Sequence, residues 1–336
     1  MALSEAEMLA KRVRSFPGVT RKMSIHEVTS KLPPVPPLAQ AKVLRTFGED
    51  SALIKVADSL LLLSSDGIWH KLIEADPYFA GYCSVLVNVN DICCKSGIPV
   101  AMVSVIGASE ELAAEITSGI AAATEKFRVP CVGGHYNPDS PQPLVSAAIL
   151  GYVEGRFIPS DSARPGDKIL AIVDLDGRVH SRYKLAWDTT THKSPSELAK
   201  LLSYPREASR RGLIRAAKDT SNPGIVGTIG MMLEASGVGG VVRVEEIPKP
   251  RGLSWDSWLL MYPGFGLVAA APPEEAEEAC RLAASYGLEA NVVGEVDESL
   301  KLSIEFKGSS AVVFDFTRDK LSGRPDSLRW LSLHPP

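Results

Sequence analysis

Short acidic motifs lie beside glycine or small polar residues at four places in the chain. They are Gly48-Glu49-Asp50, Ser65-Asp66-Gly67, Asn90-Asp91 and Asp219-Thr220-Ser221-Asn222. Carboxylates that converge on one place repel each other unless a cation neutralises them. Mg²⁺ is the fitting cation, because it is hard, prefers oxygen ligands and is commonly shared between carboxylates and phosphates. If folding brings these motifs together, they predict a magnesium site beside a phosphate group.

Asp91 gives the clearest indication of a functional site among these residues, because it lies within the otherwise apolar stretch 85–94. On a helix, Asn88 and Asp91 are three residues apart and share one face. A buried, unpaired carboxylate is costly, so it protonates, pairs or binds a metal. We therefore expect Asn88, Asn90 and Asp91 to have a partner. Taken singly, the other acidic motifs fit ordinary turns and helix caps better than a ligand site.

Glycines and a helix start could complete a phosphate site. Gly48, Gly133 and Gly134 would let backbone N–H groups approach a phosphate closely. A helix beginning near Pro223 would direct its positive end at an anion. His135 follows the glycine pair. It either holds a phosphate or shuttles a proton near neutral pH, or it is a polar loop residue bonded to a backbone carbonyl.

The elements that must position these residues alternate between strands and helices. The apolar patterns and the Gly and Pro punctuation predict strands at 59–64, 100–106, 129–132, 144–151, 168–174 and 266–271, and helices at 76–96, 110–127, 194–202, 205–217, 224–235 and 273–286. A stretch rich in Pro, Gly and small polar residues, 158–167, marks a domain boundary. The sequence thus predicts an α/β (α+β) chain with a helical arm at 1–30 and domains at 31–158 and 159–330.

Composition limits the class of protein. A chain of 336 residues with 45% hydrophobic residues can bury two cores. The net charge of -4, without a basic stripe, argues against a nucleic-acid partner. No apolar run reaches the ~18 residues of a membrane span. The five scattered cysteines contain no C-x-x-C pair, which favours a reducing, cytoplasmic compartment.

Two common nucleotide motifs find no support. The chain has no G-x-x-x-x-G-K-[ST], which excludes a P-loop. Residues 264–269 match G-x-G-x-x-A, but the apolar run 267–271 that follows reads as a strand rather than the required helix.

The order of the motifs resembles the AIR synthetase-like superfamily. Its members include AIR synthetase, thiamine-monophosphate kinase, selenophosphate synthetase and a hydrogenase maturation factor. The resemblance runs from about Phe47 to Val296 and is closest to an archaeal, methanogenesis-marker group of AIR synthase-related proteins without an assigned activity. Its motifs are Gly48-Glu49-Asp50, Ser65-Asp66, Val89-Asn90-Asp91, Gly97-Ile98-Pro99, Gly133-Gly134-His135, Pro165-Gly166-Asp167, Asp219 to Gly224 and Gly294-Glu295-Val296.

The resemblance implies a homodimer of two-domain subunits whose N-terminal sheets form a barrel, each with a C-terminal α/β sandwich domain. ATP would bind near that interface. The residues expected to hold Mg²⁺ are Asp50, Asp66 and Asp91, together with Glu49 in place of the first Asp of the kinase pattern. Those expected to contact the nucleotide are Gly48, Ser65, Asn88, Asn90, Gly133, Gly134 and Ser221. Asp219, from the second domain, would close the site, and either Asp219 or His135 would transfer a proton.

Two departures from the kinase pattern divide the functional hypotheses. His135 and Asn222 stand where thiamine-phosphate kinases have Asp. The first hypothesis is a Mg-ATP-dependent enzyme that phosphorylates a small substrate or activates its carbonyl oxygen. The second is a non-catalytic ATP-binding assembly or regulatory protein, and the third is a protein that binds no nucleotide. An acceptor would bind among the loops 184–192 and 255–262, whose tryptophans otherwise belong to a core or a dimer contact.

Overall fold

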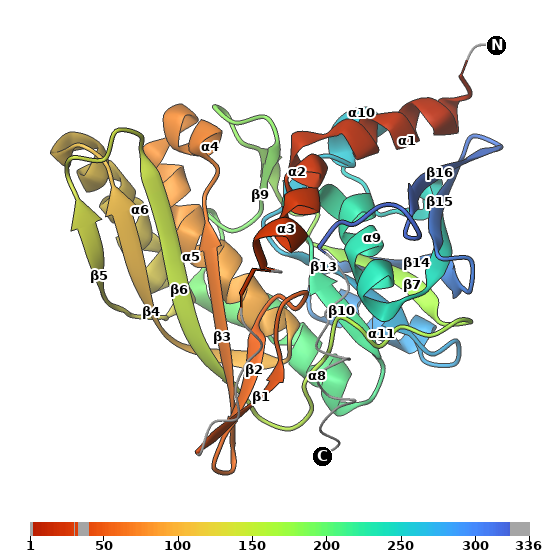
Figure 1. Cartoon of the computed structure of the whole chain (residues 1–336), viewed down its shortest axis with the longest axis horizontal. Helices are drawn as coiled ribbons and strands as arrows, with labels where there is room; N and C mark the ends of the chain where they lie inside the picture. The colour runs from red at the N-terminus through yellow and green to blue at the C-terminus, as the bar shows by residue number, and fades with distance from the viewer. Residues whose placement is uncertain (1–2, 30, 33–39, 323–336) are drawn as a thin grey trace.

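The computed structural model describes residues 3–29, 31–32 and 40–322. These residues form two lobes, each built on a β-sheet, and helix α1 of an N-terminal arm lies against the second lobe (Figure 1). No helix in these ranges is long and apolar enough to cross a lipid bilayer.

The first lobe contains a six-stranded sheet in the order β1-β2-β3-β6-β4-β5. Its neighbours are antiparallel apart from β4 and β5, which run parallel. The strands are β1 Ala41–Arg45, β2 Ala52–Val56, β3 Ser59–Gly67, β4 Gly97–Gly107, β5 Cys131–Asn137 and β6 Leu144–Val153.

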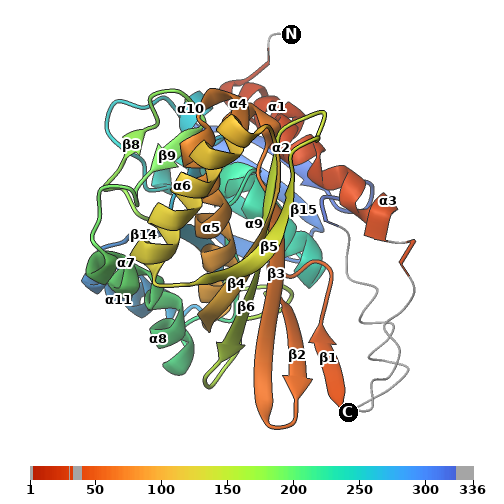
Figure 2. The same ribbon diagram turned by 90° about the vertical axis from the view of Figure 1, so that its left-hand side faces the viewer.

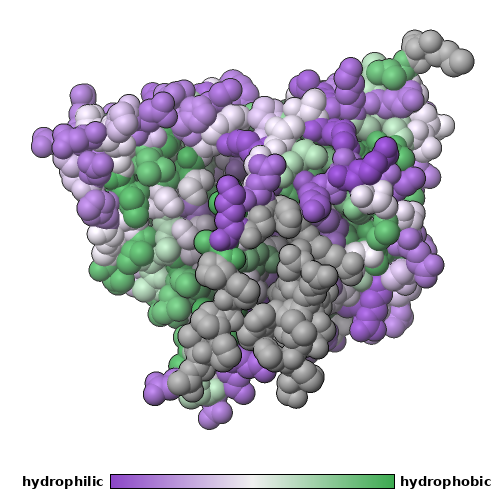
Figure 3. Space-filling view, viewed as in Figure 1, coloured by the Kyte–Doolittle hydropathy of each residue, from purple (hydrophilic) through white to green (hydrophobic). Residues whose placement is uncertain are grey.

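Helices α5 (Pro77–Cys94) and α6 (Glu110–Phe127) cover one face of this sheet, and the short helix α4 (His70–Ala75) precedes them (Figure 2). Residues alternate across the sheet, so Met102 is buried under the helices while Val103 is 40% exposed. Leu63 and Leu150 are paired neighbours on the uncovered face, and both are exposed. Apolar side chains gather over this lobe (Figure 3).

Helix α5 carries Asp91 and is almost wholly buried. Asp76 caps its start by accepting the N–H of Phe79 at 2.9 Å, and Pro77 supplies a preset φ at the first position. The helix ends at Cys94, just before Ser96 with φ +66° and the first residue of β4, Gly97. The helices predicted at 76–96 and 110–127 are confirmed.

The second lobe contains a seven-stranded sheet in the order β10-β13-β7-β14-β11-β15-β16. Its strands are β7 Lys168–Val173, β10 Ala216–Asp219, β11 Gly239–Arg243, β13 Gly266–Ala271, β14 Glu289–Asp297, β15 Lys301–Phe306 and β16 Ser309–Asp315. A small three-stranded sheet joins β8 Arg178–Val179, β9 Ala186–Asp188 and β12 Tyr262–Pro263.

Helices cover both faces of the seven-stranded sheet, which is why β13 is apolar throughout and β7 is apolar from Ile169 onward. Ile169 and Ala171 face the core formed with α1 (Glu5–Ser15) and α9 (Gly224–Ser236). Leu170 and Ile172 face the core formed with the other helices, which are α7 Pro195–Leu202, α8 Tyr204–Arg210 and α11 Ala276–Ser285. This lobe has the α/β sandwich arrangement that was predicted. The remaining short helices are η2 Val244–Glu246 and α10 Trp255–Trp258.

The N-terminal arm reaches the end of β10. After α1 it continues through α2 (Pro17–Thr20), η1 (Lys22–Ser24) and α3 (Ile25–Thr29). A Cβ at Gly18 would lie 2.1 Å from the backbone oxygen of Asn222, so only glycine allows this approach. The arm is therefore packed against the turn that follows Asp219.

Two predicted elements are wrong in part. The helix expected over 205–217 ends at Arg210, and Ala216 and Ala217 belong to β10. Helical composition did not reveal that these alanines pair with Ala270 and Ala269 in the sheet. The strand expected at 129–132 continues to Asn137, so the glycine pair and His135 lie inside β5 rather than in a loop after it.

Candidate active site between the two lobes

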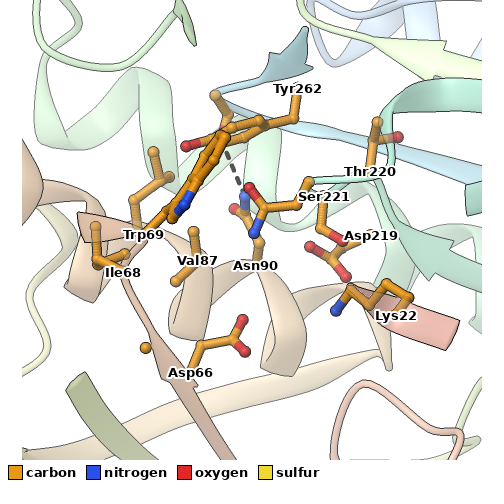
Figure 4. Close-up of a pocket in the computed structure, with 14 residues that line it drawn as sticks. Lys22, Asp66, Ile68, Trp69, Val87, Asn90, Asp219, Thr220, Ser221 and Tyr262 are labelled. Carbon is orange, nitrogen blue, oxygen red and sulfur yellow. Dashed lines mark hydrogen bonds between the residues drawn. The ribbon is translucent and has the colours of Figure 1, made fainter. Parts of the chain in front are cut away.

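A pocket opens where the two lobes and the arm meet (Figure 4). Its lining comes from the arm (Lys22), from the end of β3 and the residues after it (Asp66, Gly67, Ile68 and Trp69), from α5 (Leu86, Val87 and Asn90), and from the second lobe (Asp219, Thr220, Ser221, Asn222, Tyr262 and Gly264). Five segments distant in sequence thus contribute to one cavity.

Strand ends and a helix start position the polar side of the pocket. Asp66 lies near the end of β3, and Asp219 is the last residue of β10. The turn after Asp219 leads into α9, whose first residue, Gly224, has φ +72° and would place a Cβ 2.1 Å from the oxygen of Leu259. The first N–H of α9, that of Gly224, donates to the Ser221 oxygen at 2.8 Å, so the turn that lines the pocket is fixed to the start of this helix.

Three carboxylates at and beneath the pocket lack cationic partners within ion-pair distance in the described chain, namely those of Asp66, Asp91 and Asp219. Burial, reinforced by Asp50 and Asp66, raises the pKa of Asp219 to about 7. Burial and the neighbouring carboxylates also raise the pKa of Asp91 well above its usual value, although Ser64 donates a hydrogen bond to it. Burial likewise raises the pKa of Asp66. A cation in this place would relieve their repulsion.

The carboxylates fit a metal ion only as partial ligands. Within the described ranges, no group of three or more His, Cys, Asp or Glu side chains is arranged to hold a metal ion. Asp66 and Asp219 line the pocket, whereas Asp91 lies behind it. Mg²⁺ usually keeps several waters and takes one or two carboxylates plus substrate phosphates. Asp66 and Asp219 therefore suit a Mg²⁺ ion that arrives with a phosphate compound.

Glu49 and Asp50, predicted to belong to the same set, do not line the pocket. The buried Lys95 amine lies 3.0 Å from both Glu49 Oε2 and Asp50 Oδ2. Lys218 forms a second ion pair with Asp50. Burial alone would raise the pKa of Asp50, but Lys218 and Lys95 outweigh it and hold that pKa below its usual value. These two acids are paired inside the protein.

Asn88 and Asn90 have different surroundings on α5. Asn90 donates to the Gly264 oxygen at 3.0 Å across the lobes, and it lines the pocket. Asn88 donates to Ser84 within its own helix at 2.8 Å. The side-chain oxygens of both asparagines are buried without a hydrogen-bond partner. Asn90 therefore offers an unsatisfied acceptor behind the pocket wall.

Other predicted contacts lie away from the lining. Ser65 donates to the Ala147 oxygen of β6 at 3.0 Å. The Gly48 oxygen accepts from Lys218 at 3.0 Å. Ser221, in contrast, lines the pocket, and its contact with a nucleotide stays a prediction.

Gly133, Gly134 and His135 lie on the exposed edge strand β5. Three strand spacings separate β5 from β3, on the order of 14 Å across the sheet. Gly134 has φ +152°, and a Cβ there would lie 1.9 Å from the Ser104 oxygen, so the strand pairing itself requires glycine. Within one chain, these residues do not join the pocket.

Sequence reasoning missed Lys22 and Trp69, whereas Tyr262 lies at the end of the predicted acceptor loop 255–262. Lys22 directs its amine toward the side of the pocket formed by Asp66 and Asp219, and Trp69 and Tyr262 form the aromatic end (Figure 4). Arg21 stacks over Trp69, with 4.0 Å between its Cζ and the ring centroid. Nothing in the local sequence of the arm marks Lys22 as a pocket residue; only packing of the arm places it there.

The tryptophans of the predicted acceptor loops belong mainly to the core. Trp258 is fully buried and meets Trp187 edge to face at 5.7 Å. Trp255 packs partly buried against the same core. In these two loops, only Tyr262 lines the pocket. For the tryptophans, the alternative of a core role is confirmed.

Comparison with known proteins identifies the family. Residues 48–153 match the N-terminal domain model of AIR synthase related proteins, and residues 164–307 match the C-terminal domain model. This chain belongs to the AIR synthase-related protein family. The uncharacterized protein MJ0640 of Methanocaldococcus jannaschii is 37% identical over 93% of this chain and 97% of its own length. The predicted relationship and two-domain fold are confirmed.

More distant relatives share the fold. PurL, the phosphoribosylformylglycinamidine synthase subunit of Pyrococcus horikoshii, is 25% identical over 78% of this chain, which spans 41% of that protein. The structure of Thermotoga maritima PurL complexed with ATP matches 96% of this chain and 53% of its own, with a TM-score of 0.69 and 19% identity. The structure of AaThiL complexed with AMPPCP and TMP matches 80% of this AIR synthase-related chain and 93% of its own, with a TM-score of 0.61 and 19% identity.

Proposed function

We propose that this AIR synthase-related protein binds ATP with Mg²⁺ in the pocket between its lobes and transfers the terminal phosphoryl group to a small substrate. The observation that carries the proposal is the convergence of Asp66, Asp219 and Lys22 on one cavity, together with the turn 220–222 that precedes α9. Phosphoryl transfer depends on positioning and charge neutralisation more than on a protein nucleophile. The similar structures with ATP or AMPPCP support the choice of nucleotide.

Each charged residue has a separate task in this proposal. Asp66 and Asp219 would hold the metal ion, which would neutralise phosphate charge when bound. Burial raises the pKa of the Asp91 carboxyl, which lies close enough to both for their charges to raise that pKa further. The Lys22 amine has no ion-pair partner in the described chain, so it is free to contact a phosphate oxygen. The turn of Thr220, Ser221 and Asn222 before α9 lines the same pocket and offers further polar groups to a phosphate.

The acceptor is proposed to bind at the aromatic end of the pocket. Ile68, Trp69 and Tyr262 provide an apolar wall there, and Asn90, whose side-chain amide donates to the Gly264 oxygen, lines the same pocket. A small molecule with an apolar or planar part suits these surroundings. Asp219 would accept the proton of an attacking hydroxyl through an oxygen that the metal ion leaves free.

We also propose that the protein is a homodimer formed through the uncovered sheet face of the first lobe. Leu63, Val103, Val105 and Leu150 are 39–47% exposed on β3, β4 and β6, and Figure 3 shows apolar side chains gathered over this lobe. A patch of this kind on a sheet is typical of a protein interface. His135 lies far from the pocket of its own chain, so its predicted catalytic role requires a second copy.

Binding and turnover test the proposal separately. ATP with Mg²⁺, at ~100 times its dissociation constant, should stabilise the folded protein by roughly 2.7 kcal/mol. No thermal shift with ATP and Mg²⁺ together would contradict nucleotide binding. Formation of ADP should then depend on an added acceptor and disappear in Asp219→Asn.

Val103→Arg should convert the dimer into a monomer in sedimentation, and an unchanged dimer would contradict this interface.

A non-catalytic ATP-binding protein is the second candidate. It is favoured by Asn222, which lines the pocket where the kinase pattern has a carboxylate. Tight ATP binding without ADP formation, across a broad set of small acceptors, would support this candidate over an enzyme.

A further inference from the structure

The loop after β1 carries two acidic residues whose charges are already balanced inside the protein. The Lys95 side chain is 0% exposed, and those of Glu49 and Asp50 are 3% and 5% exposed. Lys218, 4% exposed, contacts Asp50 from the second lobe. Two carboxylates and two ammonium groups thus form one closed ion-pair group, which we call the lysine pair site (Glu49, Asp50, Lys95 and Lys218).

Hydrogen bonds occupy the remaining positions around both lysines. Lys95 donates to Ser160 Oγ at 2.5 Å and to the Ala217 oxygen at 2.6 Å. Lys218 donates to the Gly48 oxygen at 3.0 Å and to Ser160 Oγ at 3.3 Å. An ammonium group has only three N–H donors, so each lysine is fully satisfied where it lies.

The acids are held from the other side as well. Both oxygens of Glu49 lie 3.0 Å from the Ser160 N–H, and Asp50 Oδ2 lies 3.3 Å from the Asp219 N–H. Hydrogen-bond donors and cations therefore surround Glu49 and Asp50. A divalent cation could bind these carboxylates only by displacing a buried lysine. The pocket carboxylates Asp66 and Asp219 have no such partners.

We propose that Lys95 and Lys218 act as built-in cations in place of a metal ion, so that Glu49 and Asp50 bind no metal and any Mg²⁺ is held on the pocket side alone. This rests on the proposed function only for the pocket-side ion. It revises the expectation, drawn from the kinase pattern, that Glu49 and Asp50 are metal ligands.

The first test measures bound Mn²⁺ by electron paramagnetic resonance, using the full chain with AMPPCP. Asp50→Asn combined with Lys218→Met removes one charge of each sign, which preserves the balance of the buried group. The double variant should bind the same number of Mn²⁺ ions as the wild type. Asp66→Asn should weaken Mn²⁺ binding by at least about tenfold. Loss of a Mn²⁺ ion in the double variant would overturn the inference.

The second test needs no nucleotide. Lys95→Met leaves Glu49 and Asp50 with one cation instead of two, so the variant should gain a rise in Tm with Mn²⁺ that exceeds that of the wild type. Glu49→Gln combined with Lys95→Met should abolish the gain. If Lys95→Met does not fold, Lys218→Met takes its place, with Asp50→Asn and Lys218→Met as the double control.

The two tests separate the possible failures. A wild type that binds no Mn²⁺ with AMPPCP contradicts the proposed function. The nucleotide-free test then still shows whether the lysines of the lysine pair site take the place of a metal ion. A folded lysine variant that shows no additional Mn²⁺-dependent rise in Tm overturns the inference, whatever the nucleotide result.

Discussion

Two groups of carboxylates in this protein are chemically alike but differ in their electrostatic surroundings, because cations neutralise only one of them. In the lysine pair site, Lys95 and Lys218 neutralise Glu49 and Asp50. On the pocket side, Asp66 and Asp219 face a cavity, and burial raises the pKa of both. The comparison teaches that an acidic motif gains its role from the cations that folding brings to it. The first group joins the lobes, and the second is available to a ligand.

The largest expected effect comes from breaking the balanced group. Lys95→Met leaves the buried Glu49 without a cationic partner and Asp50 with Lys218 alone, and it should lower the free energy of unfolding by about 3–5 kcal/mol. Urea denaturation measures the change. The control is Lys168→Met, which removes a more exposed pair with Glu295 and should cost no more than about 1 kcal/mol. Equal effects of the two variants would contradict a special role for burial.

On the pocket side, removing a charged side chain is expected to raise the free energy of unfolding rather than lower it. In EDTA at pH 8, Asp219→Asn should stabilise the protein by more than about 1 kcal/mol, because it removes a buried charge that lacks a cation. The folded pKa of about 7 exceeds the usual value, so ionisation destabilises the fold above that pKa. The gain should therefore shrink as the pH falls from 7 toward 4. Asp50→Asn is the comparison and should be destabilising under the same conditions.

A smaller effect is expected at the arm. Lys22→Met should weaken Mg-ATP binding by about tenfold, since a phosphate contact is lost. Its unfolding free energy should stay within about 0.5 kcal/mol of the wild type, because Lys22 has no ion-pair partner in the described residues. Calorimetric titration measures the affinity. Lys22→Arg keeps the charge and should recover much of it, whereas equal weakening by both variants would indicate a steric cause.

The smallest effect should come from the cation above the aromatic wall. Arg21→Ala removes a guanidinium stacked 4.0 Å above the Trp69 ring and should cost about 0.5–1 kcal/mol of stability. Thermal unfolding measures this change, and Arg21→Lys should retain part of the interaction. If ATP affinity falls more than in Lys22→Met, the nucleotide approaches Trp69 more closely than proposed.

Local sequence patterns were sufficient to predict most of the helices and strands that surround the site. The Asp76-Pro77 start and the Gly97 stop defined α5, and the apolar run at 266–271 defined β13, because caps and periodicity are local properties. The alanine-rich end of 205–217 was misread because alanine in a fully buried strand resembles a helix former. In that segment, pairing with β13 overrode the intrinsic preference of the sequence.

The site was predicted less completely than the fold. Asp66, Asn90, Asp219 and Ser221 do meet at one pocket, as their motifs indicated. Lys22 and Trp69 escaped notice because a single Lys or Trp has no local signature. Gly134 was interpreted as a phosphate contact, yet its close approach to Ser104 is a requirement of the β4–β5 pairing. The order of motifs identified the family but could not assign every motif residue to the same cavity.

The sequence by itself determined the family, the alternation of strands and helices, and which residue types were available for chemistry. Only the tertiary structure decided which acids meet lysines and which remain open to a ligand. The physical reason is that Coulomb interactions depend on distance in space and on burial, and neither follows from position along the chain. Asp50 and Asp66 lie 16 residues apart in sequence, yet Lys218 forms an ion pair with only the first.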